Sequence, residues 1–248
     1  MDFIKKNFVK GQIRCVYVCA QRDYPKTVTL SAKRRLDLVK LAKQYEFAII
    51  EDDFDYDFQF DGAPMLPMAS ADADGMIIYL GKLGQSLFPS FQTGFVIAPE
   101  NIISEAENYL YLLDEQGDLI QEQMLSELIN EGEIYRLMKK NIVIYKQRRN
   151  ALCQLLKLYF SEIATWTVPA GGLALWLEFK VKIPLIKLAV EAEKNNLFLP
   201  KTILYQTQEI CAIRFGFAHL NLEELPIVIA KLKNAYDKVT LKNKDENL

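Results

Sequence analysis

Two charged side chains in this sequence stand where a folded chain could use them for chemistry. Asp52 lies in the acidic cluster Glu51–Asp53, which directly follows the apolar run Phe47–Ile50. A carboxylate just past the end of a strand can face a ligand pocket, or it can be a solvated loop end or a helix cap. Arg214 lies in the apolar segment Cys211–Gly216. Its guanidinium could hold a carboxylate through two parallel N–H donors, or it could form a structural ion pair.

The composition excludes several classes of function. The chain has 248 residues, of which 50% are hydrophobic and 25% are charged, and its net charge is −2. These values are typical of a globular protein with a packed core, and they provide no general basic field for nucleic acid. The sequence has no apolar run near the ~18 residues that cross a bilayer, and MDFIKKNFVKGQ lacks the apolar region of a signal peptide. We therefore expect a cytoplasmic protein.

The sequence does not predict a metal site. Its four cysteines are Cys15, Cys19, Cys153 and Cys211, and its one histidine is His219. A zinc site needs a cluster of such ligands, and no CxxC pair is present. We interpret the cysteines as reduced, mostly buried thiols and His219 as a surface or packing residue.

The first half of the chain has the pattern of an α/β protein. Ile13–Cys19 and Phe47–Ile50 are short apolar runs typical of buried strands. Between them, Ser31 is placed to cap a helix with an apolar stripe, and its Lys33–Arg35 run is expected to form a solvated face. This strand, helix, strand order predicts a right-handed parallel crossover. Met76–Gly81 and Thr93–Ala98 supply two more strands.

The second half reads as a long helical region followed by a smaller α+β unit. Residues 101–159 carry apolar residues at helical spacing, interrupted at Gly117 and Gly132. Strands are then predicted at 168–179, 197–199 and 211–215, with helices from Pro184 and over 222–236. We expect a large-domain portion over residues 1–140, a small domain over 141–240 and a charged, fraying tail over 241–248.

Six segments follow one another along the chain: VYVCAQRDYPKTVTLSAKRRLDLVKLA, IIEDDFDYDFQFDGAP, YLGKLGQSLFPSFQTGF, YKQRRNAL, AGGLALWLEF and RFGFAHLNLEEL. In this order they resemble the aminotransferase-like domain of MocR/GabR-type regulators of the GntR family. The resemblance implies a fold type I PLP-dependent transferase: a partial large domain with a mixed sheet, and a small C-terminal α+β domain. PLP is pyridoxal phosphate.

The resemblance also implies where PLP would bind and which of its partners are changed. Asp52 matches the acidic residue that bonds the ring nitrogen, and Phe54 stands where a tyrosine would donate to the ring hydroxyl. Gln85 stands at the position of the lysine that forms the imine, and an amide nitrogen cannot do so because its lone pair is delocalised. Ser86 matches a phosphate contact, and Gln92 replaces an arginine that meets the phosphate.

The resemblance places the remaining site residues as follows. Arg22 and Asp23 replace a His-Gln pair beside the ring, and Arg214 matches the arginine that holds a substrate carboxylate. Lys82 lies three residues before Gln85 and is not expected to replace the missing lysine. Family members carry a winged helix-turn-helix domain and the phosphate-binding loop of the large domain ahead of the matched region, and we interpret this chain as starting after both.

Three functions are compatible with this pattern. The first is a catalytically inactive effector or dimerisation domain of a MocR/GabR-type regulator. The second is a working PLP-dependent aminotransferase acting on an amino acid, and the third is a non-functional fragment of a split regulator. We expect a homodimer, a possible amino-acid or PLP ligand bound without a covalent bond, no direct DNA binding by this chain and no membrane association.

Overall fold

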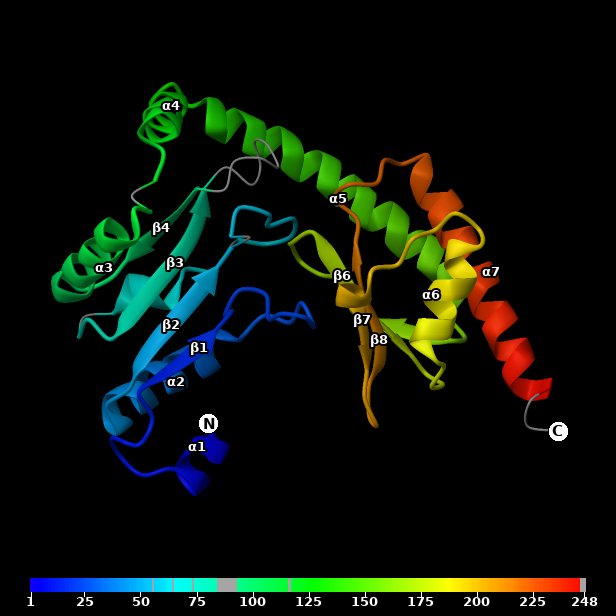
Figure 1. Ribbon diagram of the computed structural model, residues 1–248, viewed down its shortest axis with the longest axis horizontal. Coiled ribbons are helices and arrows are strands. Elements are labelled where there is room, and N and C mark those ends of the chain that lie inside the picture. The colour runs from blue at the N-terminus through cyan, green and yellow to red at the C-terminus, as the bar shows by residue number, and fades with distance from the viewer. Residues whose placement is uncertain (55, 64, 73, 84–92, 116, 246–248) are drawn as a thin grey trace. The chain divides into compact units, whose positions relative to one another are not determined.

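The computed structural model describes residues 1–248 with the exception of 55, 64, 73, 84–92, 116 and 246–248. The chain divides into two compact units, whose elements are labelled in Figure 1. Unit 1 comprises Met1–Tyr24 and Val28–Asn141, and unit 2 comprises Pro25–Thr27 and Ile142–Leu248. Each unit is built around its own four-stranded sheet.

The sheet of unit 1 is mixed, as the sequence predicts. Its strands are β1 (Cys15–Val18), β2 (Ala48–Asp53), β3 (Ile77–Leu83) and β4 (Thr93–Ile97), in the order β1-β2-β3-β4. The first three strands are parallel, and β4 runs antiparallel to β3. Helix α2 (Ala32–Tyr45) connects β1 to β2, which confirms the predicted parallel crossover.

Helix α2 has the boundaries that its capping residues dictate. The Ser31 side chain accepts a hydrogen bond from the backbone N–H of Arg34, which satisfies a donor that the first turn leaves without a helical partner. At the other end Glu46 adopts a left-handed conformation and its N–H bonds to the Ala42 carbonyl. The helix buries apolar side chains against the sheet in a core cluster formed by Ala20, Leu38, Leu41, Ala42, Phe47, Ile49, Met68 and Ile77.

The other helices of unit 1 are separated at the predicted glycines. Helix α1 (Asp2–Asn7) precedes the sheet, and the sheet is followed by α3 (Glu100–Leu113), α4 (Leu119–Asn130) and the long helix α5 (Glu133–Phe160). Gly117 and Gly132 both have a positive φ, of 91° and 72°, and lie in the two breaks. Glycine adopts this backbone conformation at little steric cost, so both residues suit the breaks between the helices. Helix α5 continues past Asn141 into unit 2.

The sheet of unit 2 is antiparallel. Its strands are β5 (Ala164–Trp166), β6 (Ala174–Phe179), β7 (Leu204–Gln206) and β8 (Cys211–Gly216), in the order β5-β6-β8-β7. Helices α6 (Leu185–Glu193) and α7 (Glu224–Asp245) pack against each other. The core of this unit is formed by buried apolar residues of α5, β6, α6, β8 and α7, including Leu152, Leu156, Phe160, Leu175, Leu177, Leu188, Ile213, Phe215, Leu225 and Ile229.

Three sequence-based predictions of local structure are wrong. The segment 197–199 is not a strand: Pro200 follows it, the short helix η2 (Lys201–Ile203) comes next, and β8 pairs instead with β7. Helix α7 runs to Asp245, so the stretch predicted as a charged tail begins as helix. Strand β2 includes the acidic cluster, which places Asp52 inside the strand instead of beyond its end.

Candidate functional site

The acidic cluster of β2 is divided between the two faces of the sheet. Residues along β2 alternate in burial, so Glu51 and Asp53 are buried and Asp52 between them is partly exposed. The Glu51 carboxylate accepts hydrogen bonds from the backbone N–H groups of Met68 and Ala69, at 2.9 and 3.0 Å, where helix η1 (Met68–Ala71) begins. Glu51 therefore has a structural role as a helix cap.

Asp53 is buried beside an aromatic hydroxyl. The Tyr79 hydroxyl lies 3.3 Å from Oδ2 of Asp53 and donates to it. Burial raises the pKa of Tyr79, and the neighbouring Asp53 carboxylate raises it further. Both effects keep the hydroxyl protonated, because ionisation would create a second negative charge in a poorly solvated place.

Asp52 is engaged by a tyrosine from the adjacent strand. The Tyr17 hydroxyl donates a hydrogen bond to Oδ2 of Asp52, and Sγ of Cys19 lies 3.6 Å from the same hydroxyl. The hydrogen bond to Asp52 is the main reason that the pKa of Tyr17 is raised, and burial adds to it. Burial also raises the pKa of the Cys19 thiol. These three side chains form a hydrogen-bonded row from Asp52 on β2, through Tyr17 on β1, to Cys19 just after β1.

Arg22, which was predicted beside a cofactor ring, is buried and bonded to the protein. Its Nη2 donates to the carbonyl of Phe58 at 3.1 Å and to Oε1 of Gln59 at 2.8 Å. The adjacent Asp23 is exposed. Arg22 thus ties the loop after β1 to residues that follow β2, and this contact gives the residue a structural function.

Arg35 was expected on a solvated helix face, and this expectation is wrong. Its side chain is 5% exposed, and burial lowers its pKa. The guanidinium donates to the carbonyls of Leu30, Leu66 and Ala20 at 3.0, 2.9 and 2.9 Å, and to Oε1 of Gln21 at 2.7 Å. A planar fork with five donors suits such a cluster of carbonyls, so Arg35 fixes the loop beside Asp52.

The remaining positions predicted to contact PLP are only partly described. Phe54 lies directly after β2 and is half-buried, and it carries no hydroxyl. Gln85, Ser86 and Gln92 lie outside the described residues. Lys82 is exposed in β3. Its Cα pairs with that of Gly94 on β4.

The residue types at the positions that the family resemblance assigns to PLP differ from those expected to hold the cofactor covalently. The carboxylate expected to meet the ring nitrogen, that of Asp52, already accepts a hydrogen bond from Tyr17. By the same resemblance, Phe54 lacks the donor expected for the ring hydroxyl, and Gln85, which lies outside the described residues, has an amide where a lysine is expected. Covalent PLP chemistry requires an amine at that position.

Arg214 lines a pocket that lies entirely within unit 2. The residue is partly buried on β8, opposite Trp176 of β6, whose indole packs 5.0 Å from the ring of Tyr205. The pocket has a volume of about 340 Å³, and most of its lining is apolar. The apolar lining includes Leu197, Phe198, Leu199, Pro200, Ile203 and Val228.

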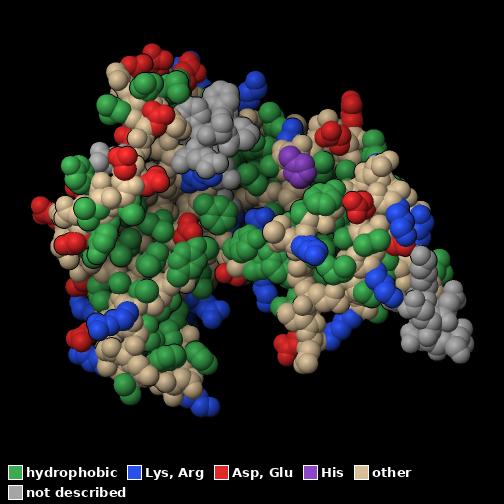
Figure 2. All heavy atoms as spheres, in the orientation of Figure 1, with side chains coloured by type: hydrophobic (Ala, Val, Ile, Leu, Met, Phe, Trp, Pro, Cys, Tyr) green, Lys and Arg blue, Asp and Glu red, His purple; other side chains and the backbone are tan. Residues whose placement is uncertain are grey.

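Sequence reasoning missed the position of His219. This exposed residue, the purple side chain at the surface in Figure 2, lines the same pocket as Arg214. The four residues between them carry the chain out of β8, and only the fold brings the two side chains to one pocket. The sequence offered one signal for this shared pocket: His219 follows Arg214, the arginine predicted to bind a carboxylate, by five residues.

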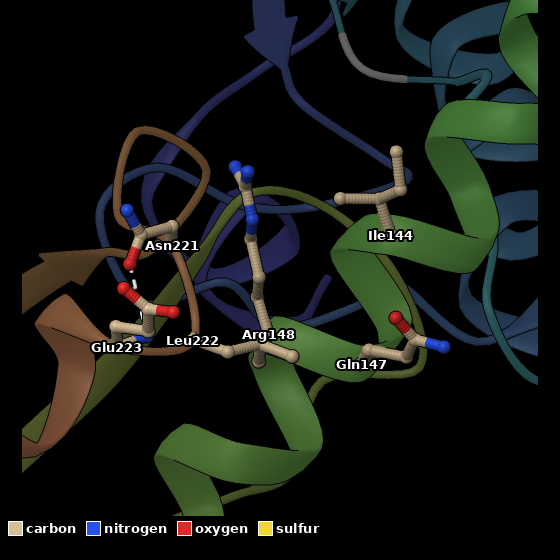
Figure 3. A pocket seen from close by; sticks show the side chains of 6 residues that line it. All are labelled: Ile144, Gln147, Arg148, Asn221, Leu222 and Glu223. Atoms are coloured by element: carbon tan, nitrogen blue, oxygen red, sulfur yellow. Dashed lines mark hydrogen bonds between the residues drawn. The ribbon is translucent and has the colours of Figure 1, made fainter.

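A second groove in unit 2 has a structural explanation. It has a volume of about 370 Å³ and is lined by Ile144, Gln147 and Arg148 of α5 and by residues 221–223 (Figure 3). The Arg148 guanidinium donates to the carbonyl of Ala218. This bond joins α5 to the turn before α7, so it links two of the segments that carry the family resemblance.

The polar groups beside this groove form a helix cap. Oδ1 of Asn221 accepts from the N–H groups of Glu223 and Glu224 at 2.9 and 2.8 Å, and Oε2 of Glu224 accepts from the N–H of Asn221 at 2.8 Å. This reciprocal arrangement is a capping box. It satisfies backbone donors at the start of α7. Figure 3 shows one of these bonds, from the N–H of Glu223 to Oδ1 of Asn221.

Within the described ranges, no group of three or more His, Cys, Asp or Glu side chains is placed to hold a metal ion. The helices among the same residues include none that is long and apolar enough to cross a membrane.

Comparison with solved structures defines the class of fold. The crystal structure of the multiple substrate aminotransferase from Thermococcus profundus superposes with a TM-score of 0.86 at 24% identity, covering 97% of this chain and 60% of that one. The chain therefore has the fold of the fold type I PLP-dependent aminotransferases, as predicted. No family model matches the chain.

Sequence comparison finds relatives of two kinds. YisV of Bacillus subtilis, an uncharacterized HTH-type transcriptional regulator, is 26% identical over 218 residues, covering 87% of this chain and 44% of the relative. Aromatic-amino-acid aminotransferase 1 of Thermococcus litoralis is 27% identical over 224 residues, covering 89% and 54%. The predicted resemblance to regulators and aminotransferases is confirmed, and the chain spans about half the length of these relatives.

Proposed function

We propose that this chain is a non-catalytic aminotransferase-like module that serves a transcriptional regulator in the cytoplasm as an effector-binding and dimerisation domain. The observation that carries the proposal is an amide, Gln85, at the position that the family resemblance assigns to the imine-forming lysine. An amide cannot form the imine on which transamination depends. Such a module retains the scaffold and a ligand pocket, and transmits binding to its partners.

Two features of the described residues support a loss of cofactor chemistry. Oδ2 of Asp52 accepts a hydrogen bond from Tyr17, and Arg22 holds the backbone at Phe58. Both positions would face the ring in a working enzyme, according to the family resemblance. Their engagement within the protein favours a domain that does not hold PLP covalently.

The proposals about partners and location rest on the net charge, the free thiols and the exposed apolar side chains of the chain. A net charge of −2 gives the chain little attraction for DNA, so we assign DNA binding to another domain or chain. The cytoplasmic assignment is supported by four cysteines, each with a free thiol in this structure. Dimerisation is supported by the exposed apolar side chains of α3 and α4.

The central test is covalent trapping of PLP. Purified chain is mixed with PLP, reduced with borohydride and analysed by mass spectrometry, with a working aminotransferase as the positive control. We expect no site-specific adduct and no transamination of amino-acid donors above background. A stoichiometric adduct on Lys82 or on any other single lysine contradicts the proposal and supports a PLP enzyme with an altered site.

A matched variant tests how far the site has changed. Gln85→Lys restores only the amine, and the other substitutions at Phe54 and Gln92 remain. We expect this variant to show no turnover. Turnover in Gln85→Lys would mean that the rest of the cofactor site is intact. That result would contradict the proposed loss of the other cofactor contacts.

A further inference from the structure

One face of the unit 2 sheet carries two aromatic rings and a carboxylate on neighbouring strands. In the strand order β6-β8-β7, Ala212 of β8 has Glu178 of β6 on one side and Tyr205 of β7 on the other (Figure 1). Trp176 lies two residues before Glu178 on β6, so its side chain points from the same face of the sheet. The opposite face of β6 and β8 forms part of the apolar core of the unit.

A small residue allows the two rings to meet. Ala212 is fully buried, although the side chains around it on this face are only partly buried. Its methyl group leaves space for the indole of Trp176 to lie across β8 towards Tyr205, and the two ring centroids are 5.0 Å apart. Because the ring planes are inclined at 54°, the rings form an open corner instead of a stack.

A carboxylate holds one of these rings and gives the corner a negative charge. Nε1 of Trp176 donates a hydrogen bond to Oε2 of Glu178 at 3.1 Å. This bond keeps the indole beside the carboxylate. The face of an aromatic ring is the negative part of its quadrupole. The corner therefore combines two aromatic rings with a carboxylate, and both kinds of group attract a cation.

The positive side chains nearest to the corner limit where a cation can lie. Arg214 follows Ala212 by two residues on β8, and its charge repels a cation at that end of the face. Lys180, which follows β6, donates from its ammonium to the carbonyl of Ser161 at 2.8 Å. A cationic ligand is therefore best placed over Ala212, beside Glu178.

We propose that this corner of unit 2, formed by Trp176, Tyr205 and Glu178, binds the trimethylammonium group of a small solute. A primary ammonium is strongly hydrated, and aromatic rings replace its hydrogen bonds to water poorly. A quaternary ammonium donates no hydrogen bonds, so its methyl groups can contact both rings while Glu178 balances the charge.

The inference goes beyond the proposed function, because it assigns a class of ligand. The three side chains belong to unit 2 and include none of the positions that the family resemblance assigns to PLP or to a substrate carboxylate. Trapped PLP together with binding of a trimethylammonium probe would contradict only the proposed function. Absence of both would contradict only this inference.

The test compares choline with its neutral isostere, 3,3-dimethyl-1-butanol, on the full chain at constant ionic strength. Dissociation constants come from ligand-observed NMR, in which each probe has one strong resonance from three equivalent methyl groups. A cation contributes about two- to fivefold in affinity at each partly exposed ring, so we expect choline to bind at least about fivefold more tightly. Ethanolamine, a primary ammonium, should also bind more weakly than choline. No saturable binding of choline, or equal binding of choline and either other probe, overturns the proposal.

Substitutions assign the contacts to individual side chains. Tyr205→Leu removes one ring and should weaken choline several-fold, whereas Tyr205→Phe keeps the ring and should retain binding. Glu178→Gln removes the charge, and it should weaken choline several-fold without affecting the neutral isostere. Trp166→Phe is the matched control, because Trp166 pairs with Leu177 on the opposite face of the sheet and should not affect binding.

Circular dichroism establishes which variants are folded. If Tyr205→Leu fails to fold, the comparison of choline with its isostere and the effect of Glu178→Gln still decide. Choline binding that is unchanged in both Tyr205→Leu and Glu178→Gln overturns the proposal.

Discussion

The hydroxyl of Tyr17 donates a hydrogen bond to Oδ2 of Asp52 across strands β1 and β2. This bond engages one of the two oxygens of the carboxylate that the family resemblance assigns to the ring nitrogen of PLP. It also raises the pKa of Tyr17, so the hydroxyl remains a donor at ordinary pH. A sheet with the aminotransferase fold thus uses its ligand-facing carboxylate for an internal contact.

The buried guanidinium of Arg35 should be essential for the stability of unit 1. Arg35→Ala would leave the carbonyls of Leu30, Leu66 and Ala20 without their donor, and we expect a loss on the order of 3 kcal/mol in the free energy of unfolding. Arg35→Lys should recover little of this loss, because an ammonium cannot reproduce the planar fork.

Urea denaturation followed by circular dichroism measures these changes. Arg34→Ala is the matched control, since Arg34 is the preceding residue of α2 and is exposed. It should alter the unfolding free energy by less than about 0.5 kcal/mol. Similar stability losses for Arg34→Ala and Arg35→Ala would show that the contacts of Arg35 contribute no special stabilisation.

Tyr79 should make unit 1 sensitive to alkali. Its folded-state pKa is raised, so above pH ~10 the unfolded chain releases this proton while the folded chain retains it. The stabilisation is fully present below the unfolded pKa and is lost as the pH rises above it, by up to about 1.4 kcal/mol per pH unit. Tyr79→Phe should remove this component.

The measurement is the free energy of unfolding between pH 9 and pH 11. Tyr111→Phe serves as the control, because the Tyr111 side chain is 72% exposed. Its pH dependence should match that of the wild type. If Tyr79→Phe shows the same alkaline slope as Tyr111→Phe, the raised pKa of Tyr79 is wrong.

Gly81 should not accept a side chain. A Cβ at this position would overlap the ring of Phe95, which covers Gly81 from the paired position on β4. Gly81→Ala should therefore destabilise unit 1 by about 1–3 kcal/mol. The same substitution in a Phe95→Ala background should cost less, because the overlap is gone.

A double-mutant cycle by urea denaturation tests this steric coupling. The expected result is a smaller cost for Gly81→Ala when Phe95 is absent. An additive cycle would indicate that the ring moves aside without cost, and would remove the steric explanation for glycine at this position.

The apolar side chains of α3 and α4 should drive self-association. Leu112, Leu119 and Ile120 are 76%, 78% and 81% exposed in the single chain. Contiguous apolar surface of this kind is typical of protein interfaces. Sedimentation velocity should show dimers or larger species, and Leu112→Lys combined with Ile120→Lys should shift the population towards monomer.

Leu158→Lys is the control for this experiment, since Leu158 is also exposed, at 72%, but lies near the end of α5 in unit 2. It should leave the sedimentation profile unchanged. A wild-type chain that remains a compact monomer at high concentration would contradict the proposed dimerisation role.

The sequence by itself determined much of the fold, because the features involved are local. Ser31 predicts the start of α2, and Gly117 and Gly132 predict the breaks between the helices, since capping and positive φ depend on residue type and nearest neighbours. The parallel crossover from β1 to β2 follows from element order. The presence of Gln85 where the family resemblance expects a lysine is also read from the sequence alone.

Only the tertiary structure decided what several side chains do. Arg35 has the same charge and helical setting as Arg34, yet it is buried because its side chain meets carbonyls from three separate segments. Asp52 is bonded to Tyr17, 35 residues away in the chain, and His219 meets Arg214 at one pocket. Such contacts depend on strand register and on which face of a sheet is buried, and neither is specified by residues that are neighbours in sequence.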